Sequence, residues 1–271
     1  GLNAFAKKYP SRYYDVGIAE QHALTFAAGL ALSGNKPVVA IYSTFMQRAY
    51  DQLIHDIAIQ NIPMLFAIDR AGLVGADGAT HSGNFDISFM RCIPNLILMA
   101  PSNESECFHM LSFGYKYNGV CAVRYPRGNS PGSSIELLND PIRIGCANKV
   151  RTGKKVAILA FGPIIEVCRE VAEEINASLI DMRFIKPIDK KMIRQVCKDH
   201  ELIVSVEENA ITGGAGSSVL EVISESNLLT KTLVLGIPDQ FFEHASQQEV
   251  LKACGLDKQS IKRKIVKQLN G

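Results

Sequence analysis

The chain contains no tryptophan and has almost no excess of charge, because 29 lysines and arginines stand against 27 aspartates and glutamates among 271 residues. So balanced a charge argues against a general nucleic-acid binder, and a hydrophobic fraction of 47% argues against disorder. The longest nearly apolar run, 23–32, has about half of the roughly 18 residues that suggest a membrane span. We therefore expect neither nucleic acid nor a membrane as a partner.

The seven cysteines are an odd number and lie scattered, with no CxxC pair and no cluster with histidine at zinc spacing. This pattern predicts reduced thiols, no metal site in the chain and a cytoplasmic location. The sequence opens Gly-Leu-Asn, without a basic segment leading into an apolar one, so we expect no signal peptide. We expect it to begin inside a longer protein, for which the plastid stroma is the alternative location.

Short β-rich runs alternate with longer helical runs, which predicts parallel sheets covered by helices. A segment rich in Gly, Pro, Ser and Asn at 128–145 separates two groups of such runs. We predict the α/β class, with two three-layer α/β/α domains over 1–130 and 148–271 and a linker at 131–147. The expected strands are Tyr14–Ile18, Val38–Ile41, Met64–Ile68, Leu96–Ala100, Cys121–Arg124, Val156–Ala160, Ser178–Asp181, Leu202–Val206 and Thr232–Gly236.

Helical patterns in the second group cover Ile164–Asn176, Asp189–Asp199 and Val219–Leu229. The glycine-rich run 213–217 precedes the last of them, and its backbone amides could bind an anion. Tight packing of a helix start against its sheet is the favoured interpretation. The spacing of a dinucleotide-binding GxGxxG motif and its downstream acidic partner are both missing.

A polar cluster at 15–22 ends the first predicted strand and feeds into the apolar run 23–32. That run is apolar on nearly every face, so we expect a buried helix. Glu20 would then lie at the start of an interior helix, at the sheet edge where α/β proteins bind ligands. The alternative is a first-turn acid that only complements the helix dipole, and the residues alone leave both open.

A second cluster, 42–52, follows the next strand in the same loop-then-helix position. Phe45 offers an aromatic face and Arg48 a charge one turn later, although core packing is an alternative for the ring. The third cluster, 69–86, combines four glycines with Arg70, Asp77 and His81, which favours a shaped binding loop.

A fourth element, Tyr125–Gly128, is a rigid turn that would aim Arg127 at the same edge. Because the other polar loops follow neighbouring strands, they are expected to converge at one edge of one sheet. Taken together, the four elements predict a binding site there.

These four motifs resemble the 1-deoxy-D-xylulose-5-phosphate synthases, thiamine-diphosphate enzymes of the transketolase superfamily. The resemblance extends to 180–187 and 206–216, and so runs over the whole chain. The Glu-Gln pair at 20–21 indicates only the superfamily, whereas the other motifs, in this order, are more specific. The resemblance implies a pyrimidine-binding domain without its first strand, followed by a transketolase C-terminal domain.

The resemblance also implies a reaction, in which pyruvate and glyceraldehyde 3-phosphate condense with loss of CO2 to 1-deoxy-D-xylulose 5-phosphate, a precursor of isoprenoids, thiamine and pyridoxal. The implied cofactors are thiamine diphosphate and Mg²⁺, with the metal ligands in a diphosphate-binding domain of the same parent chain. That domain and a second copy in a homodimer are the expected protein partners. The present chain alone is expected to be inactive.

The resemblance assigns the cofactor contacts to four residues. Glu20 would hydrogen-bond a ring nitrogen of the cofactor's aminopyrimidine, and we expect burial to raise the pKa of this carboxyl. Phe45 would stack on the pyrimidine, with Tyr42 and Arg48 beside it.

The resemblance assigns the substrate contacts to the later clusters. Arg70 and Arg127 would hold the phosphate of the acceptor, a role that suits guanidinium groups. His81 and Asp77 would orient the substrate and assist proton transfer, with Tyr42 also at the substrate.

Two other functions remain open. The β subunit of a 2-oxo acid dehydrogenase joins the same two kinds of domain, but the turn at 125–128 and the run 47–52 fit the synthases better. A non-catalytic interaction module is the other alternative, against which the presence of Glu20 argues.

Overall fold

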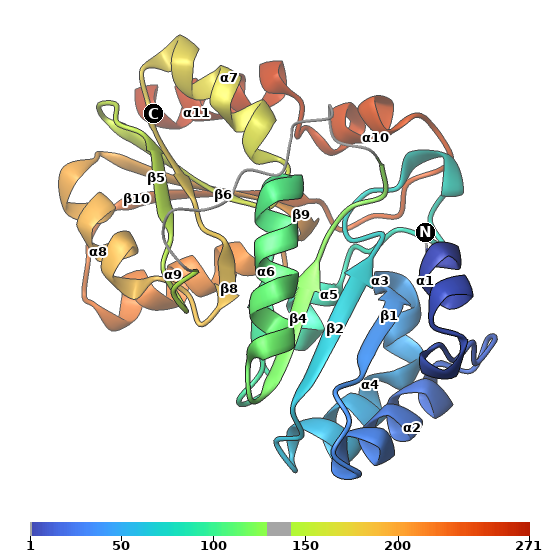
Figure 1. The fold of residues 1–271 in the computed structure, drawn as a ribbon. Helices are drawn as coiled ribbons and strands as arrows, with labels where there is room; N and C mark the ends of the chain where they lie inside the picture. The colour runs from blue at the N-terminus through green and yellow to red at the C-terminus, as the bar shows by residue number, and fades with distance from the viewer. Residues whose placement is uncertain (1, 129–141) are drawn as a thin grey trace.

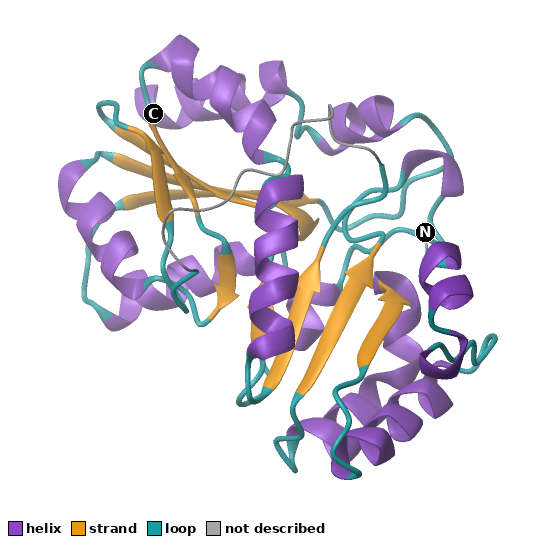
Figure 2. Cartoon of the chain, viewed as in Figure 1, coloured by secondary structure: helices purple, strands orange, loops and turns teal. Residues whose placement is uncertain are grey.

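The computed structural model describes residues 2–128 and 142–271, whose strands form two five-stranded sheets flanked by helices (Figure 1, Figure 2). The strand orders are β1-β2-β4-β3-β8 and β10-β9-β6-β7-β5. All neighbouring strands pair in parallel except β8 with β3 and β5 with β7. The predicted α/β class with mostly parallel sheets is therefore confirmed.

The strands of the first sheet are β1 (Val38–Tyr42), β2 (Met64–Asp69), β3 (Ile97–Met99), β4 (Val120–Arg124) and β8 (Phe184–Lys186). The helices before residue 128 are α1 (Asn3–Lys8), α2 (Glu20–Leu32), α3 (Ser43–Met46), α4 (Tyr50–Gln52), α5 (Asp86–Met90) and α6 (Glu104–Lys116), with 3₁₀ turns at Pro10–Arg12, Gln47–Ala49 and Gly75–Asp77 and a π turn at Leu53–Ala58. Because β2 and β4 have neighbours on both sides and helices over both faces, they are almost wholly apolar.

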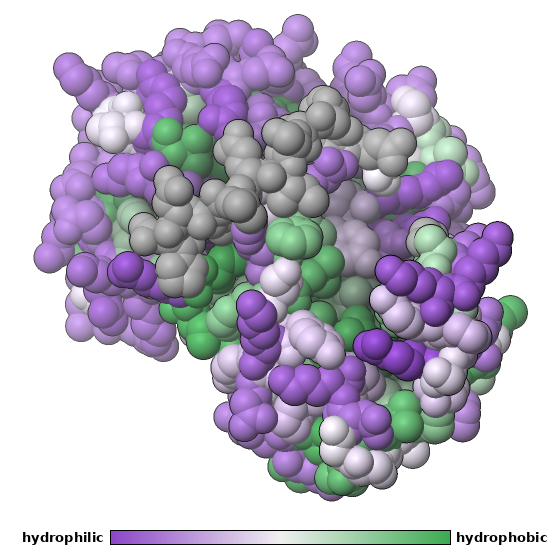
Figure 3. Space-filling model, in the orientation of Figure 1, coloured by the Kyte–Doolittle hydropathy of each residue, from purple (hydrophilic) through white to green (hydrophobic). Residues whose placement is uncertain are grey.

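The second sheet contains β5 (Asn148–Arg151), β6 (Val156–Phe161), β7 (Ser178–Asp181), β9 (Leu202–Ala210) and β10 (Lys231–Ile237). Its helices are α7 (Ile165–Ile175), α8 (Lys190–Asp199), α9 (Ala215–Glu225), α10 (Gln247–Cys254) and α11 (Lys258–Asn270). Hydrophilic residues cover most of the outer surface, and hydrophobic residues show in the hollow between the two halves (Figure 3).

The predicted strand at Tyr14–Ile18 is wrong, since the chain between Pro10–Arg12 and α2 is a loop. Asp15 Oδ1 accepts a hydrogen bond from the Gly17 N–H at 2.9 Å, and Gly17 has a left-handed φ of +62°. Such a turn, built by an aspartate and a glycine, is incompatible with an extended strand. Among the described residues, β1 is consequently the edge of the first sheet.

The predicted burial of the helix that follows is also wrong. Helix α2 buries one face, with Leu24, Ala27 and Ala28, against β1 and the 53–58 turn, while Leu32 is 69% exposed. The helix lies on the outside of the molecule (Figure 1), so only one of its faces meets the sheet layer.

Two short edge strands, β5 and β8, were not expected from the sequence. Strand β8 lies late in the chain but pairs antiparallel with β3 of the first sheet, Met99 opposite Phe184 and Leu98 opposite Lys186. One hydrophobic cluster also spans both sheets, for example through Phe66 and Phe161. The two sheets therefore share a core, while the linker drawn at 131–147 lies mostly outside the described residues and stays a prediction.

Strand β9 runs four residues beyond its predicted end, through Glu207, Glu208 and Asn209, all three of them buried. Glu207 accepts hydrogen bonds from the Ala215 N–H at 2.7 Å and the Gly216 N–H at 2.8 Å, at the start of α9. The helix start thus binds a carboxylate of its own chain. A Cβ on Gly216 would lie 2.4 Å from Val234, which supports the packing interpretation of the glycine-rich run.

Candidate active site

The loops that follow β1, β2 and β4 lie at one edge of the first sheet, as expected for parallel strands whose carboxyl ends point the same way (Figure 1). Helix α3 begins directly after β1, and the loop after β2 runs to α5. The start of α2 supplies Glu20. This edge therefore holds all of the polar clusters that the sequence singled out.

Glu20 is the first residue of α2 and is 8% exposed. The Arg48 guanidinium donates a hydrogen bond from Nη1 to Glu20 Oε2 at 2.6 Å. Burial acts to raise the pKa of Glu20, but the hydrogen bond from Arg48, the backbone N–H of Glu20 and the charge of Arg48 together lower this pKa below its ordinary value. The expected rise in the pKa of Glu20 is thus wrong, because the sequence did not indicate that Arg48 would lie against this carboxyl.

A cavity of ≈ 330 Å³ opens beside this ion pair. Its walls combine the loop before α2, the strand β1 and the two aromatic rings that follow this strand. The lining residues are Val16, Gly17, Ile18, Glu20, Ala23, Val39, Ala40, Ile41, Tyr42, Phe45 and Arg48. Such a cavity suits a flat ring with apolar faces and a polar edge.

The rings of Tyr42 and Phe45 stack, with centroids 5.5 Å apart and an angle of 12° between their planes. The His81 ring meets Phe45 edge-on at 5.4 Å, and the Arg70 guanidinium lies 4.1 Å from the centroid of Tyr42. Glu20, paired with Arg48 in the cavity wall, lies next to this group. Four of the eight predicted site residues therefore line the cavity, namely Glu20, Tyr42, Phe45 and Arg48, and His81 and Arg70 contact its two aromatic rings.

The other two predicted residues pair with each other, since Arg127 Nη1 donates to Asp77 Oδ1 at 2.9 Å. Arg70 instead forms an ion pair with Asp69. Each arginine thus already has an anionic partner with which a phosphate would compete. The assignment of roles to these residues stays a prediction.

Sequence reasoning missed the apolar wall of the cavity at 16–18, because that segment was assigned to a strand. It also missed Thr44, whose hydroxyl donates to the Thr80 carbonyl at 3.2 Å and joins α3 to the 69–86 loop. An Asp-x-Gly triplet before a helix is the signal that would have indicated a loop.

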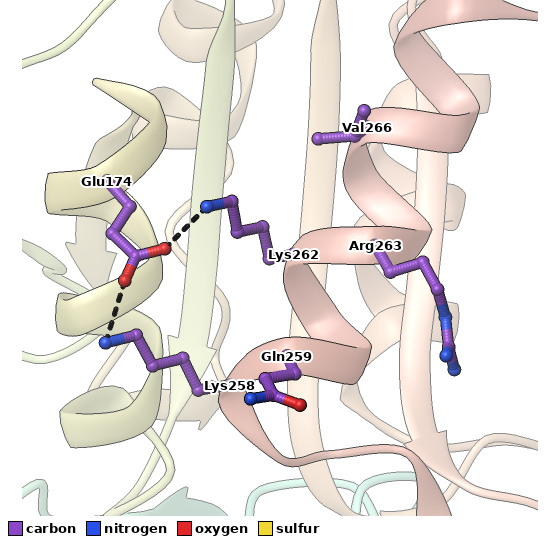
Figure 4. Close-up of a pocket in the computed structure, with 6 residues that line it drawn as sticks. All are labelled: Glu174, Lys258, Gln259, Lys262, Arg263 and Val266. Carbon is purple, nitrogen blue, oxygen red and sulfur yellow. Dashed lines mark hydrogen bonds and ion pairs between the residues drawn. The ribbon is translucent and has the colours of Figure 1, made fainter.

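A larger hollow of ≈ 500 Å³ lies elsewhere, between α7 and α11 on the second half of the chain (Figure 4). Its floor carries Glu174, which pairs with Lys258 at 2.9 Å and Lys262 at 2.7 Å. These three side chains are 39–44% exposed, so the hollow lacks the buried polar group of the first cavity.

Residues 2–128 and 142–271 contain no cluster of three or more His, Cys, Asp or Glu side chains placed to hold a metal ion. In the same residues, no helix has both the length and the apolar character needed to cross a bilayer.

The ion pair between Arg48 and Glu20 leads to a testable prediction. Arg48→Met removes the hydrogen bond and the charge that lower the pKa of Glu20 and leaves its burial, so we expect this pKa to rise. The lowered pKa of Glu20 contributes stability that is fully present above the unfolded pKa and is lost as pH falls through the folded pKa. In the variant this contribution at neutral pH should be smaller, because the folded pKa is no longer held down by Arg48. The measurement is a ¹³C NMR titration of the glutamate carboxyls in the full-length protein.

Arg127→Met is the control for that titration, because Arg127 pairs with Asp77 and not with Glu20. An unchanged Glu20 titration in Arg48→Met would show that the ion pair does not set this pKa.

Models of known protein families show which family the chain belongs to. Residues 1–133 match the model for the transketolase pyrimidine binding domain, and residues 145–261 match the model for the transketolase C-terminal domain. The chain belongs to the transketolase family. The predicted superfamily is thereby confirmed.

Curated relatives within this family identify more specifically which of its members the chain is similar to. The chain is 57% identical over 266 residues to a 1-deoxy-D-xylulose-5-phosphate synthase of Haemophilus influenzae, covering 98% of the chain and 42% of that protein. It is 56% identical over 269 residues to the synthase of Methylobacillus flagellatus, covering 99% of the chain and 44% of that protein. This transketolase-family chain thus spans less than half the length of these relatives.

Solved structures of the family share the fold. A structure described as a split gene transketolase, inactive β4 tetramer, matches with a TM-score of 0.88 at 27% identity, over 98% of this chain and 87% of that one. A transketolase of Campylobacter jejuni matches with a TM-score of 0.72 at 17% identity, over 93% of this chain and 39% of that one. The second likeness concerns the fold alone.

Proposed function

We propose that the full-length protein is a thiamine-diphosphate-dependent transferase that condenses pyruvate with glyceraldehyde 3-phosphate, releasing CO2, to give 1-deoxy-D-xylulose 5-phosphate. The observation that carries the proposal is the cavity in which a buried glutamate at a helix start lies beside an aromatic pair. The identity of 57% to a synthase over 98% of this chain supports it.

The cavity residues fit the pyrimidine end of this cofactor. Phe45 and Tyr42 offer flat apolar surface, and the Glu20 carboxyl offers a hydrogen-bonding group that is nearly removed from water. Bound thiamine diphosphate would supply the carbanion chemistry, which protein side chains cannot supply themselves. Glu20 would hold a proton at the ring nitrogen, and Arg48 would set how readily the carboxyl releases that proton.

The remaining residues of the site would handle substrate. Arg70 and Arg127 would bind the phosphate of the acceptor, exchanging Asp69 and Asp77 for a more highly charged anion. His81 packs against Phe45 and would orient the substrate and move a proton. Asp77, released from Arg127, would assist that transfer.

We assign Mg²⁺ to a diphosphate-binding domain of the same parent chain and divide the present chain into a pyrimidine-binding domain (1–130), a linker (131–147) and a C-terminal domain (148–271). A cytoplasmic homodimer is part of the proposal. This chain alone would be inactive, and the structural neighbour of matching extent, described as an inactive β4 tetramer, supports that view.

The test measures CO2 release from pyruvate with thiamine diphosphate and Mg²⁺, with and without glyceraldehyde 3-phosphate, for the full-length protein and for this chain. We expect release that the acceptor stimulates, and only with the full-length protein. No release by the full-length protein would overturn the proposed function. Capture of a lipoyl-bearing acyltransferase would instead support the 2-oxo acid dehydrogenase alternative, against which the names of the relatives argue.

A prediction concerns the acceptor phosphate. Replacing Arg70 or Arg127 by alanine should weaken binding of glyceraldehyde 3-phosphate by about 1.5–3 kcal/mol, the range for hydrogen bonds to charged groups. The KM for the acceptor should therefore rise by roughly 10- to 150-fold while the KM for pyruvate stays the same. Steady-state kinetics with each substrate varied in turn is the measurement.

Arg169→Ala is the control for these kinetics, because Arg169 lies on α7 and pairs with Glu166 on its own helix. A change confined to the KM for pyruvate would contradict the phosphate role.

A further inference from the structure

The loop after β2 carries Arg70, Asp77 and His81, and both of its ends are held by the last residues of β9 in the other sheet. At the first end, Glu208 Oε2 accepts a hydrogen bond from the Leu73 N–H at 3.3 Å. At the second end, Asn209 Oδ1 accepts from the Ile87 N–H at 3.1 Å. Three consecutive residues, Glu208–Ala210, take part, since the Ala210 N–H donates to the Asn84 carbonyl at 2.8 Å.

The base of the same loop is closed by its own backbone. Gly72 and Gly83 exchange two hydrogen bonds, of 2.9 and 2.8 Å. Gly72 has a φ of +80°, and a Cβ there would lie 2.9 Å from both Cβ and Oε2 of Glu208. The Glu208 side chain therefore packs directly on the closed base of the loop. A residue larger than glycine at position 72 would be too close to this side chain.

The contact between Glu208 and the loop is buried, and other charged groups lie beside it. Arg124, 2% exposed, donates from Nη2 to the Glu208 carbonyl at 3.1 Å and from Nε to Asp86 Oδ2 at 2.8 Å. Burial raises the pKa of the Glu208 carboxyl. An oxygen of this carboxyl accepts from Leu73 in either protonation state, so the contact needs an acceptor and not a charge.

We propose that Glu208 is a positioning residue for the proposed reaction, on which this inference rests. By fixing the base of the loop from the neighbouring sheet, it would hold His81 against Phe45 and keep Arg70 over Tyr42. Side chains placed by such second contacts lose less freedom when substrate binds, and a misplacement of about 1 Å costs roughly 100-fold in rate. The second half of the chain would thus act on the site without touching substrate.

The test compares Glu208→Leu, which removes the acceptor at similar size, with Glu208→Gln, which keeps one, in the full-length protein. Hydrogen exchange of the amides at 70–86 is measured together with kcat and KM for both substrates. For Glu208→Leu we expect exchange of the Leu73 and Gly83 amides to rise at least tenfold and kcat/KM for the acceptor to fall about tenfold. Glu208→Gln should restore both to near the original values.

Gly72→Ala tests the same contact from the other side and does not alter the glutamate, which keeps the proposal testable if Glu208→Leu fails to fold. We expect the same two effects, because the new Cβ would lie 2.9 Å from Cβ and Oε2 of Glu208 and because alanine disfavours the left-handed φ of this position. Glu207→Gln is the matched control, because Glu207 is the preceding residue of β9 but binds the start of α9. In Glu207→Gln one of the two acceptor oxygens is replaced by an amide nitrogen, so exchange should rise at Ala215 or Gly216 and not in the loop.

Two outcomes would overturn the positioning role: unchanged exchange of the loop amides in Glu208→Leu, or faster exchange with unchanged kcat/KM. Failure of the proposed function is recognised separately, since it appears as absent synthase activity in the original protein before any variant is compared.

Discussion

Glu20→Ala is expected to lower the turnover rate of the full-length protein by about 10²–10⁴-fold, the range for loss of general acid–base catalysis. Glu20 is the buried carboxyl of the cavity, and Arg48 is its hydrogen-bonding partner. Without it, the cavity would have no carboxyl group to hold a proton at the ring nitrogen of the cofactor's pyrimidine. The rate of product formation at saturating substrate and cofactor is the measurement.

The control variant, Glu166→Ala, distinguishes a catalytic role of Glu20 from simple stabilisation of a helix start. Glu166 is an exposed first-turn glutamate of α7 and does not line the cavity. If Glu20 only complemented a helix dipole, both alanine variants would lose roughly 0.3–1 kcal/mol of stability and neither would lose activity. An unchanged rate in Glu20→Ala would refute the assignment of this residue.

Asp86→Ala should lower the free energy of unfolding by about 3–5 kcal/mol, because it leaves the Arg124 guanidinium buried without its counter-charge. Asp86 is fully buried and Arg124 is 2% exposed. The Asp86 carboxylate also accepts from the Ile87 N–H at 2.9 Å, so the start of α5 loses a partner as well. Urea-induced unfolding, followed by circular dichroism, measures the shift in midpoint.

Two further variants test whether the loss of stability in Asp86→Ala comes from the buried ion pair. Glu225→Ala breaks an exposed, solvent-screened ion pair with Lys190 and should shift the midpoint far less than Asp86→Ala. Asp86→Leu combined with Arg124→Met removes both charges and should cost less than Asp86→Ala. Equal midpoints for Asp86→Ala and Glu225→Ala would show that the buried pair has no special weight.

The sequence predicted the parts of the fold that local patterns determine. Continuous apolar runs at Met64–Ile68 and Val156–Ala160 lie within central strands β2 and β6, as their composition indicates. Strand β8 was missed because three residues beside a proline, one of them a lysine, have no periodicity to detect. Its strand character comes from pairing with β3, about 87 positions earlier in the chain.

The same division applies to the site. The polar loops after β1 and β2 were predicted because parallel strands bring their carboxyl ends to one edge. The direction of the pKa shift at Glu20 was not predicted, because it depends on a contact with Arg48, 28 residues away. Glu208 lies 135 residues from Leu73, and two consecutive acids at the end of an apolar strand were the signal that would have drawn attention to it.

The pairing of β8 with β3 limits how this protein can be cut into pieces for expression. A fragment that ends near residue 130 would lack β8 and would leave the backbone of β3 unpaired along one side. Open strand edges of this kind recruit further copies of the same chain and lead to aggregation. A soluble fragment of the first sheet should therefore retain residues 184–186 or carry a charged substitution on β3.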